Sequence, residues 1–347
     1  MRRRRRGAGF QDILSDYSGL SDIGSGPFAN VYGAVENETG QPVALKIFET
    51  DAGVLEILSR EIKDLGRVDH PNVLIPRRVG STPDDRPVVV MDLCGQSLAQ
   101  VIGESGPLSA QETAGVGIKI ASGLAAMHEW GFAHQNVKPQ NILSTLMGEP
   151  ALSDPGESSL HLSVRTMAGG GVFTAFHSPP EKFEGHAVTP ATDVYGLAST
   201  MYQLLSGRAP FQPFDEEPPI SVVLRILRDP VAPLPADVPF RLAEILAAGL
   251  EKSPAARPPS AAAFADLLRE AAAQEGWTVA VAPARQPSPS QPAAPSADAD
   301  DLSAARSPQR SWRRNRRGVT QPQEGDRNVV LPEGSRRGSM DRPPRSS

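Results

Sequence analysis

The spacing of apolar residues divides the chain into two patterned parts and a tail. Between residues 18 and 94, short apolar stretches alternate with polar residues and turns, which is typical of strands. There we expect a hairpin over 23–35, strands over 42–47 and 87–93, and one helix over 54–65. Farther along, apolar residues recur at helical spacing, which predicts helices over 110–130, 191–205, 220–228, 241–250 and 260–273.

A small strand-rich unit followed by a larger helical unit predicts an α+β fold with two lobes. We expect the first lobe over residues 18–94 and the second over 95–275, preceded by a basic extension over 1–17. In the tail, 276–347, proline, serine and arginine replace the apolar period. Such a composition cannot bury enough apolar surface to offset chain entropy, so we expect the tail to be disordered.

The formal charge of -5 conceals an uneven distribution. Residues 2–6 are all arginine, and residues 281–347 hold 12 arginines against 7 acidic residues, so each end carries a charge of +5 and the middle carries -15. The basic ends could contact an anionic surface such as lipid or nucleic acid, or the acidic middle itself. The alternative is that both ends are simply solvated.

Two observations bear on the compartment. The chain has one cysteine, Cys94, so an internal disulfide is excluded. No apolar run is long enough to cross a bilayer, so we expect no transmembrane segment, and the arginines at residues 2–6 are not followed by the apolar core of a secretory signal. We therefore expect a cytoplasmic protein.

A glycine-containing segment over 24–31 lies between two predicted strands. Gly24 and Gly26 would let the backbone approach a phosphate closely, although a plain hairpin turn explains the glycines equally well. Pro27 within the segment has no N–H and therefore removes one potential phosphate donor.

Lys46 follows in an apolar strand, where a charged side chain needs a partner. Glu61, on the next predicted helix, could supply that partner. The alternative for Lys46 is a surface position on an edge strand.

The most informative segment is 134–141, which reads His-Gln-Asn-Val-Lys-Pro-Gln-Asn. Together with the segments before and after it, it resembles the family of bacterial eukaryotic-like (Hanks-type) serine/threonine protein kinases. The motifs that carry the resemblance lie in the expected order at residues 24–31, 43–46, 92–94, 134–141, 153–156, 179–181, 193–196 and 256–258.

The resemblance implies a site for ATP with Mg²⁺, or with Mn²⁺ in its place. The implied nucleotide-binding residues are Gly24, Gly26, Val31, Ala44, Lys46, Glu61, Met91, Asp92 and Cys94. By the same resemblance, Asn141 and Asp154 would hold the metal, and Lys138 would steady the transferring phosphoryl group. For Cys94 a small apolar linker role is the alternative that we favour over a chemical one.

Three further residues are implied to support the fold of the helical lobe. Glu181 should pair with a buried Arg257, and Asp193 should brace the catalytic loop. These positions argue for the fold and not for activity.

Several positions depart from the kinase pattern. Asn136 stands where the family has the aspartate that takes the proton from the substrate hydroxyl, and an amide cannot act as a carboxylate base. Gln135 replaces the arginine that pairs with an activating phosphothreonine, so phosphorylation at Thr166 or Thr174 should not switch the domain by that route. Pro155 replaces a packing phenylalanine, which should alter any switching at that point.

These departures predict a degenerate kinase, or pseudokinase, that binds ATP with Mg²⁺ and acts as a regulator or scaffold. Two alternatives stay open: a serine/threonine kinase that tolerates Asn136, and an interaction protein that no longer needs nucleotide. The protein partner or substrate is not identifiable from the chain. Ser339, which follows two arginines in the tail, is a candidate phosphorylation site, with chance occurrence as the alternative.

Overall fold

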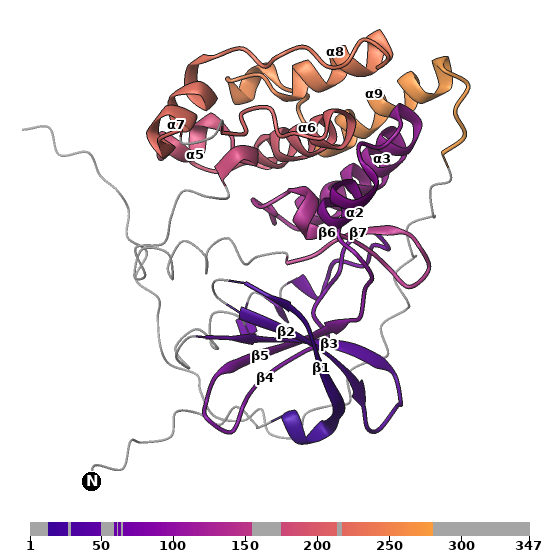
Figure 1. The fold of residues 1–347 in the computed structure, drawn as a ribbon, viewed down its shortest axis with the longest axis vertical. Coiled ribbons are helices and arrows are strands. Elements are labelled where there is room, and N and C mark those ends of the chain that lie inside the picture. The colour runs from indigo at the N-terminus through magenta and orange to yellow at the C-terminus, as the bar shows by residue number, and fades with distance from the viewer. Residues whose placement is uncertain are drawn as a thin grey trace, which may run out of the picture. The chain divides into compact units, whose positions relative to one another are not determined.

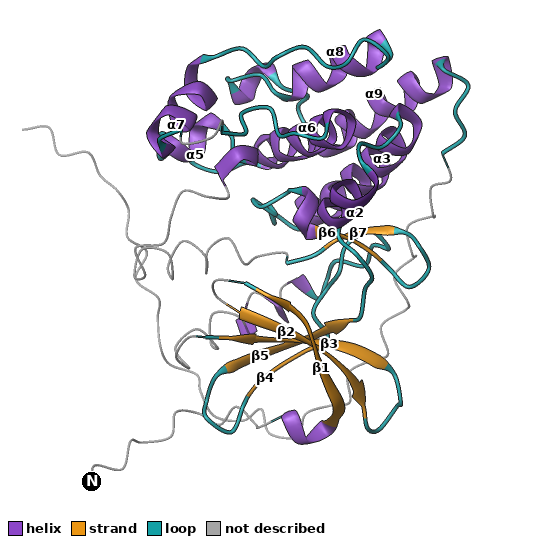
Figure 2. Cartoon of the chain, viewed as in Figure 1, coloured by secondary structure: helices purple, strands orange, loops and turns teal. Residues whose placement is uncertain are grey.

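The computed structural model describes residues 13–26, 29–49, 59–60, 62–63, 65–154, 175–213 and 217–279. In this part of the chain β1 to β5 gather in one region and the long helices in another, with the short strands β6 and β7 beside α2 (Figures 1 and 2). The predicted α+β, two-lobed fold is confirmed.

Five antiparallel strands form the first lobe, in the spatial order β1-β2-β3-β5-β4. Their bounds are β1 Tyr17–Ser25, β2 Ala29–Glu36, β3 Pro42–Phe48, β4 Arg78–Ser81 and β5 Pro87–Asp92. The hairpin and the strands at 42–47 and 87–93 were predicted within about one residue at most ends. The short edge strand β4 was not predicted, and the helix predicted over 54–65 lies mostly outside the described residues.

The sheet is apolar on both faces because side chains alternate along its central strand β3. Val43, Leu45 and Ile47 point to one face, where they join a buried cluster with β5 residues. Ala44 and Phe48 belong to the cluster on the opposite face. Lys46 lies between them in the alternation and therefore also points to this second face, which is the face that carries the candidate site.

The chain just before β1 packs against the first of these faces. Ile13 is only 2% exposed, its N–H donates to the carbonyl of Ser81 at 3.2 Å, and a short 3-10 helix, Leu14–Asp16, leads into β1. Gly80 makes this possible: a Cβ there would lie 2.5 Å from the side chain of Ile13. Ile13 and Tyr17 thus belong to the sheet's core.

The second lobe is built mainly from helices, with one small two-stranded sheet. The elements are α2 Leu98–Ser105, α3 Ala110–Glu129, β6 Ile142–Ser144, β7 Pro150–Leu152, α5 Pro180–Phe183, α6 Pro190–Ser206, α7 Pro219–Arg228, α8 Phe240–Gly249 and α9 Ala261–Gln274. Short 3-10 helices lie at Pro139–Asn141, Ala175–His177 and Pro254–Ala256. The five helices predicted from periodicity all exist, whereas α2, α5, β6 and β7 were not predicted.

Helices α3, α6, α8 and α9 pack around one large apolar core. Gly117 lets α3 approach α6 closely, because a Cβ there would lie 2.4 Å from the sulfur of Met201. Both α2 and α3 begin with reciprocal capping boxes, Ser97 with Gln100 and Ser109 with Glu112. None of the helices described has the length and apolar character needed to cross a bilayer.

Candidate functional site

His134 is a buried residue of the loop that contains the candidate catalytic position, and its ring contacts the backbone at two places. Its Nε2 lies 2.9 Å from the carbonyl oxygen of Ser153, and its Nδ1 lies 3.2 Å from the backbone N of Asn136. A carbonyl only accepts and an N–H only donates, so the ring is neutral and carries its proton on Nε2. Burial, which outweighs the opposing charge of Asp193, lowers the pKa of His134 and favours the same neutral form.

Asp193, near the start of α6, fixes the backbone of the same loop. Its carboxylate accepts hydrogen bonds from the backbone N–H groups of His134 at 2.7 Å and Gln135 at 2.6 Å. It also lies 2.8 Å from Nε2 of His128, at the end of α3. The predicted bracing role of Asp193 is therefore confirmed. The carboxylate is 1% exposed, so its charge is balanced by these N–H groups and not by water.

Asn136 occupies the position where the resemblance predicts a catalytic base. Its backbone carbonyl accepts a hydrogen bond from the side-chain Nδ2 of Asn141 at 2.9 Å, so the two predicted site residues are directly bonded. The carbonyl of Asn141 in turn accepts from the N–H of Ser153 at 2.8 Å, next to Asp154. The structure thus brings positions 136, 141 and 154 to one place, although the side chain at 136 is an amide.

Lys46 and Asp154 form an ion pair across the candidate site. Lys46 Nζ lies 3.0 Å from Asp154 Oδ1, and the two side chains are 12% and 20% exposed. Asp154 has a positive φ of 59°, a conformation that non-glycine residues rarely adopt. Such conformations are typically retained where surrounding contacts require them, often at functional sites.

Three of the predicted nucleotide-binding residues share one apolar patch. Ala44 and Met91 are buried in the same cluster, and Val31 packs against it. Ala44 and Met91 are also directly paired across β3 and β5. An apolar patch beside the Lys46–Asp154 pair is suited to the flat face of a purine base.

The two other predicted residues near this patch have less specific surroundings. The Asp92 side chain forms an ion pair with Arg77. Cys94 is half-buried, and burial together with the charge of Asp92 raises the pKa of its thiol to about 11. A protonated thiol fits the apolar linker role that we favoured from the sequence.

The glycine segment forms the end of the β1–β2 hairpin. The N–H of Gly24 donates to Asp22 Oδ1 at 3.1 Å, and the N–H of Gly26 donates to the carbonyl of Ala29 at 2.9 Å. The N–H groups of both glycines are therefore engaged within the hairpin, and either could bind a phosphate only by giving up its present bond.

Several predicted residues lie outside the part of the chain that the structure describes. These include the partner proposed for Lys46, the proline after Asp154, two candidate threonines and the tail serine: Glu61, Pro155, Thr166, Thr174 and Ser339. The arginine-rich ends lie outside it as well, so their contact with an anionic surface stays a prediction.

The predicted Glu181–Arg257 pair is confirmed. Two guanidinium nitrogens of Arg257 each lie 2.8 Å from a carboxylate oxygen of Glu181, and both side chains are almost fully buried. Thr192 also donates to Glu181 at 3.1 Å. Burial would raise the pKa of Glu181, but the hydrogen bonds of Arg257 and of the backbone, with the Arg257 charge, hold it below its usual value.

Sequence reasoning missed three residues near the catalytic loop. His128 contacts Asp193, as described above, and Lys182 in α5 donates to the carbonyl of Gln135. His177 is 8% exposed and lies 2.8 Å from the hydroxyl of Ser199. Each contact joins residues far apart in the chain, and the only available signal was polar side chains at otherwise apolar positions.

The donor set fits Mg²⁺ bound together with a nucleotide. Because the side-chain Nδ2 of Asn141 donates to the backbone carbonyl of Asn136, the side-chain Oδ1 of Asn141 can act as an acceptor. Asp154 supplies a carboxylate. Oxygen ligands of this kind are those that Mg²⁺ prefers, with phosphates supplying others. Within the described residues, no three His, Cys, Asp or Glu side chains form a group that could hold a metal by itself.

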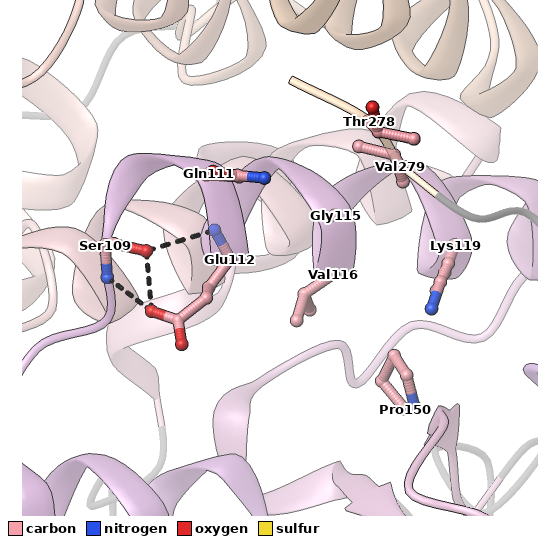
Figure 3. Close-up of a pocket in the computed structure, with 9 residues that line it drawn as sticks. All are labelled: Ser109, Gln111, Glu112, Gly115, Val116, Lys119, Pro150, Thr278 and Val279. Atoms are coloured by element: carbon pink, nitrogen blue, oxygen red, sulfur yellow. Dashed lines mark hydrogen bonds between the residues drawn. The ribbon is translucent and has the colours of Figure 1, made fainter.

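A separate groove of about 530 Å³ lies along the first half of α3 (Figure 3). Its walls come from Gly115 and Val116 of α3, from Pro150 and from Val279. Its charged side chains already have partners, since Glu112 bonds Ser109 and Lys119 lies 2.6 Å from Glu149. None of the residues predicted to bind nucleotide lines this groove, and we do not place the nucleotide there.

Comparison with known proteins gives consistent matches over most of the chain. A family model described as the protein kinase domain matches residues 17–267. The serine/threonine-protein kinase PknK of Mycobacterium bovis is 35% identical over 280 residues, covering 77% of this chain and 24% of PknK. PknA of Mycobacterium tuberculosis is 30% identical over 256 residues, covering 71% of this chain and 59% of PknA.

A third relative is a probable serine/threonine-protein kinase of Clostridium perfringens, 27% identical over 249 residues. That alignment covers 70% of this chain and 36% of the relative. This chain therefore spans less than two thirds of the length of each of these three relatives.

Proposed function

Because this chain belongs to the protein kinase domain family, together with bacterial serine/threonine kinases, we propose that it binds ATP with Mg²⁺ and has weak or no phosphotransfer activity. In this proposal it works in signalling as a regulator or scaffold for another protein. In the same proposal, the kinase-like part covers residues 18–275.

The observation that carries the proposal is the amide side chain of Asn136 at the base position. The loop around it is held as a working site would require, by Asp193 and by the bond from Asn141. Positioned acid–base groups contribute about 10²–10⁴-fold in rate, so losing one leaves a slow enzyme at best.

The residues that would handle nucleotide support binding. Lys46 would contact phosphate oxygens, while Val31, Ala44 and Met91 would pack against the base. Asn141 and Asp154 would hold Mg²⁺, which when bound would neutralise negative charge on the phosphates.

A second candidate function is favoured by the comparisons. The relatives PknK and PknA are named as serine/threonine-protein kinases, and phosphoryl transfer depends largely on positioning and electrostatics. An active kinase that tolerates Asn136 is therefore the alternative, with a protein serine or threonine as substrate.

Phosphotransfer from labelled ATP, first with Mg²⁺ and then with Mn²⁺, separates these two functions. We expect no or weak signal from the wild type and a clear gain in Asn136→Asp, since the rest of the site is in place. Wild-type signal that disappears in Lys46→Ala would instead establish an active kinase.

A thermal-shift titration with ATP tests the remaining alternative, a protein that does not use nucleotide. A ligand stabilises the state that binds it, so we expect the melting temperature to rise with ATP concentration. An unchanged melting temperature in wild type and in Asn136→Asp would refute nucleotide binding.

A further inference from the structure

The end of α9 is capped in a way that redirects the chain. The N–H of Gly276 donates to the carbonyl of Ala273 at 3.1 Å, and the N–H of Trp277 donates to the carbonyl of Ala272 at 2.8 Å. Gly276 has a φ of 71°, the left-handed conformation that commonly follows a helix. These two bonds and this φ form a Schellman motif, which stops the helix and turns the backbone off its axis.

The residues after this cap pack against the helical lobe. Trp277 and Val279 both contact its apolar core, whereas Thr278 between them is exposed. A Cβ added to Gly115 of α3 would lie 3.9 Å from Cγ1 of Val279, which is ordinary contact distance. Side chains that alternate between inward and outward are typical of an extended segment. The chain therefore continues past α9 as an extended segment that reaches α3.

The part of the chain that the structure describes ends at Val279, inside the groove along α3 (Figure 3). Val279 forms one wall of this groove, and Val116 and Pro150 contribute to the others. Consecutive Cα atoms are about 3.8 Å apart, so the residue that follows Val279 begins at the groove as well. The covalent chain thus brings its own next residues to this surface.

The lining of the groove favours an uncharged occupant. Glu112 is bonded to Ser109, and Lys119 lies 2.6 Å from Glu149, so both charged side chains of the lining have partners within the lobe. The other lining residues are neutral. A further charge buried here without a partner would be unfavourable, whereas apolar side chains would gain contacts.

The sequence after Val279 has this character for five residues. Residues 280–284 read Ala-Val-Ala-Pro-Ala and carry no charge, and the next residue is Arg285. An extended segment repeats its facing every second residue, so Val281 would face the same way as Val279. Small apolar side chains at the point where the chain enters an apolar groove are suited to fill it.

We propose that residues 280–284 occupy the groove along α3, with Val281 packed against Val116 and Pro150. The start of the tail is then fixed to the helical lobe, and the arginine-rich sequence beyond begins from this face of α3. The inference is independent of the proposed nucleotide binding, since none of the residues predicted to bind nucleotide lines the groove.

Limited digestion of the full chain with trypsin tests this at Arg285, the first basic residue after the segment. A protease cuts a packed segment only when it opens, so the cleavage rate follows the population of the open form. Val281→Asp would place a charge against the apolar lining, and we expect cleavage after Arg285 to become about tenfold faster. Val330→Asp makes the same substitution far along the tail and should leave this rate unchanged. Equal rates in wild type and Val281→Asp would overturn the inference.

Gly115→Leu tests the same contact from the side of α3. Among the described residues, Val279 alone lies within 4 Å of the added Cβ, at 3.9 Å, so the helix accepts the side chain and its outer atoms enter the groove. We expect faster cleavage after Arg285, with no further increase when Val281→Asp is added, because both changes displace one segment. Fully additive effects would place the segment elsewhere and overturn the inference. A cleavage rate that falls as the protein concentration rises would overturn it too, since a second copy would then supply the occupant.

Discussion

The carboxylate of Asp193 accepts a hydrogen bond from the backbone N–H of Gln135 at 2.6 Å. Gln135 has a φ of 67°, which non-glycine residues rarely adopt, so this bond holds a conformation that the chain would otherwise leave. The same carboxylate accepts a hydrogen bond from the backbone N–H of His134. This bond fixes the direction in which the loop leaves the helical core. The orientation of Asn136 therefore depends on a residue 57 positions later in the sequence.

Asp193→Asn should destabilise the protein by about 2–4 kcal/mol. An amide has one acceptor oxygen instead of two, and its NH₂ group would face the N–H donors of the loop. Urea denaturation followed by circular dichroism measures the effect. Asp266→Asn is the control, since Asp266 is 68% exposed in a surface pair and should change the unfolding free energy by less than about 0.5 kcal/mol. Equal effects of the two changes would rule out the bracing role.

The Glu181–Arg257 pair should be the most sensitive ion pair among the described residues. Arg257→Met would leave the Glu181 carboxylate buried with only Thr192 as a side-chain donor, which should cost about 3–5 kcal/mol. Arg257→Lys keeps the charge but loses the two parallel bonds, and should recover only part of that loss. If the lysine variant matched the wild type in urea denaturation, charge alone and not bidentate geometry would explain the pair.

The sequence predicted those features that rest on local periodicity or on motif order. Helices such as α3 and α6 are long and strongly patterned, and the residues of the catalytic loop are adjacent in the chain. By contrast, β4 contributes only four residues, of which Val79 is the one large apolar side chain, so no period was visible. The strands β6 and β7 have three residues each and exist because they pair with one another.

Contacts between distant residues were the other class that the sequence could not predict. Ile13 lies in a short segment after the basic stretch where no apolar period is visible, and its burial requires the space left by Gly80. His128 and His177 are likewise single polar residues whose partners, Asp193 and Ser199, become neighbours only in the folded chain. Such pairs need the three-dimensional arrangement, since no spacing in the sequence relates them.

The contact between Ile13 and Gly80 makes the segment before β1 part of the folded domain. Gly80→Ala should cost about 1–3 kcal/mol, because the new methyl group would lie 2.5 Å from the Ile13 side chain. Ile13→Ala should cost about 2–4 kcal/mol through the cavity it leaves. In the double variant the alanine at 80 should fill part of that cavity, so the two costs should not add.

Gly103→Ala serves as the control for this cycle. Gly103 lies within α2 with nothing within 4 Å of the added Cβ, so this change should stabilise the protein by about 0.5–1 kcal/mol through helix propensity. Strictly additive effects at 13 and 80 would show that the two residues do not contact one another in solution.

Cys94 should react slowly with alkylating reagents. With a pKa of about 11, roughly one thiol in a thousand is ionised at pH 8, so iodoacetamide should react about 10²-fold more slowly than with an ordinary thiol. The rate should rise about tenfold per pH unit below pH 10. Since the chain has no other cysteine, mass spectrometry reads this rate directly, and unfolding in urea should restore the ordinary rate. Protection by ATP would support its predicted place at the nucleotide; a fast native reaction would contradict its burial.

His177 should make the protein less stable as the pH falls below about 6.5. Burial lowers its pKa to about 4, with the Gln203 side chain opposing this shift and the charge of Lys138 adding to it. An unfolded histidine binds a proton near pH 6.5, whereas the native one stays neutral until about pH 4, so the unfolding free energy decreases throughout that interval. One such group contributes a slope of up to about 1.4 kcal/mol per pH unit.

His177→Asn removes the titrating ring while keeping an atom that can bond to Ser199, so this variant should have a shallower pH dependence between pH 6 and pH 5. The slope is the quantity to compare, because the substitution also lowers stability at every pH by leaving unfilled space. Glu181 does not interfere, since its pKa is held below its usual value and its contribution is lost only in more acid solution. If His177→Asn retained the wild-type slope, the acid sensitivity would have to come from other buried histidines such as His134.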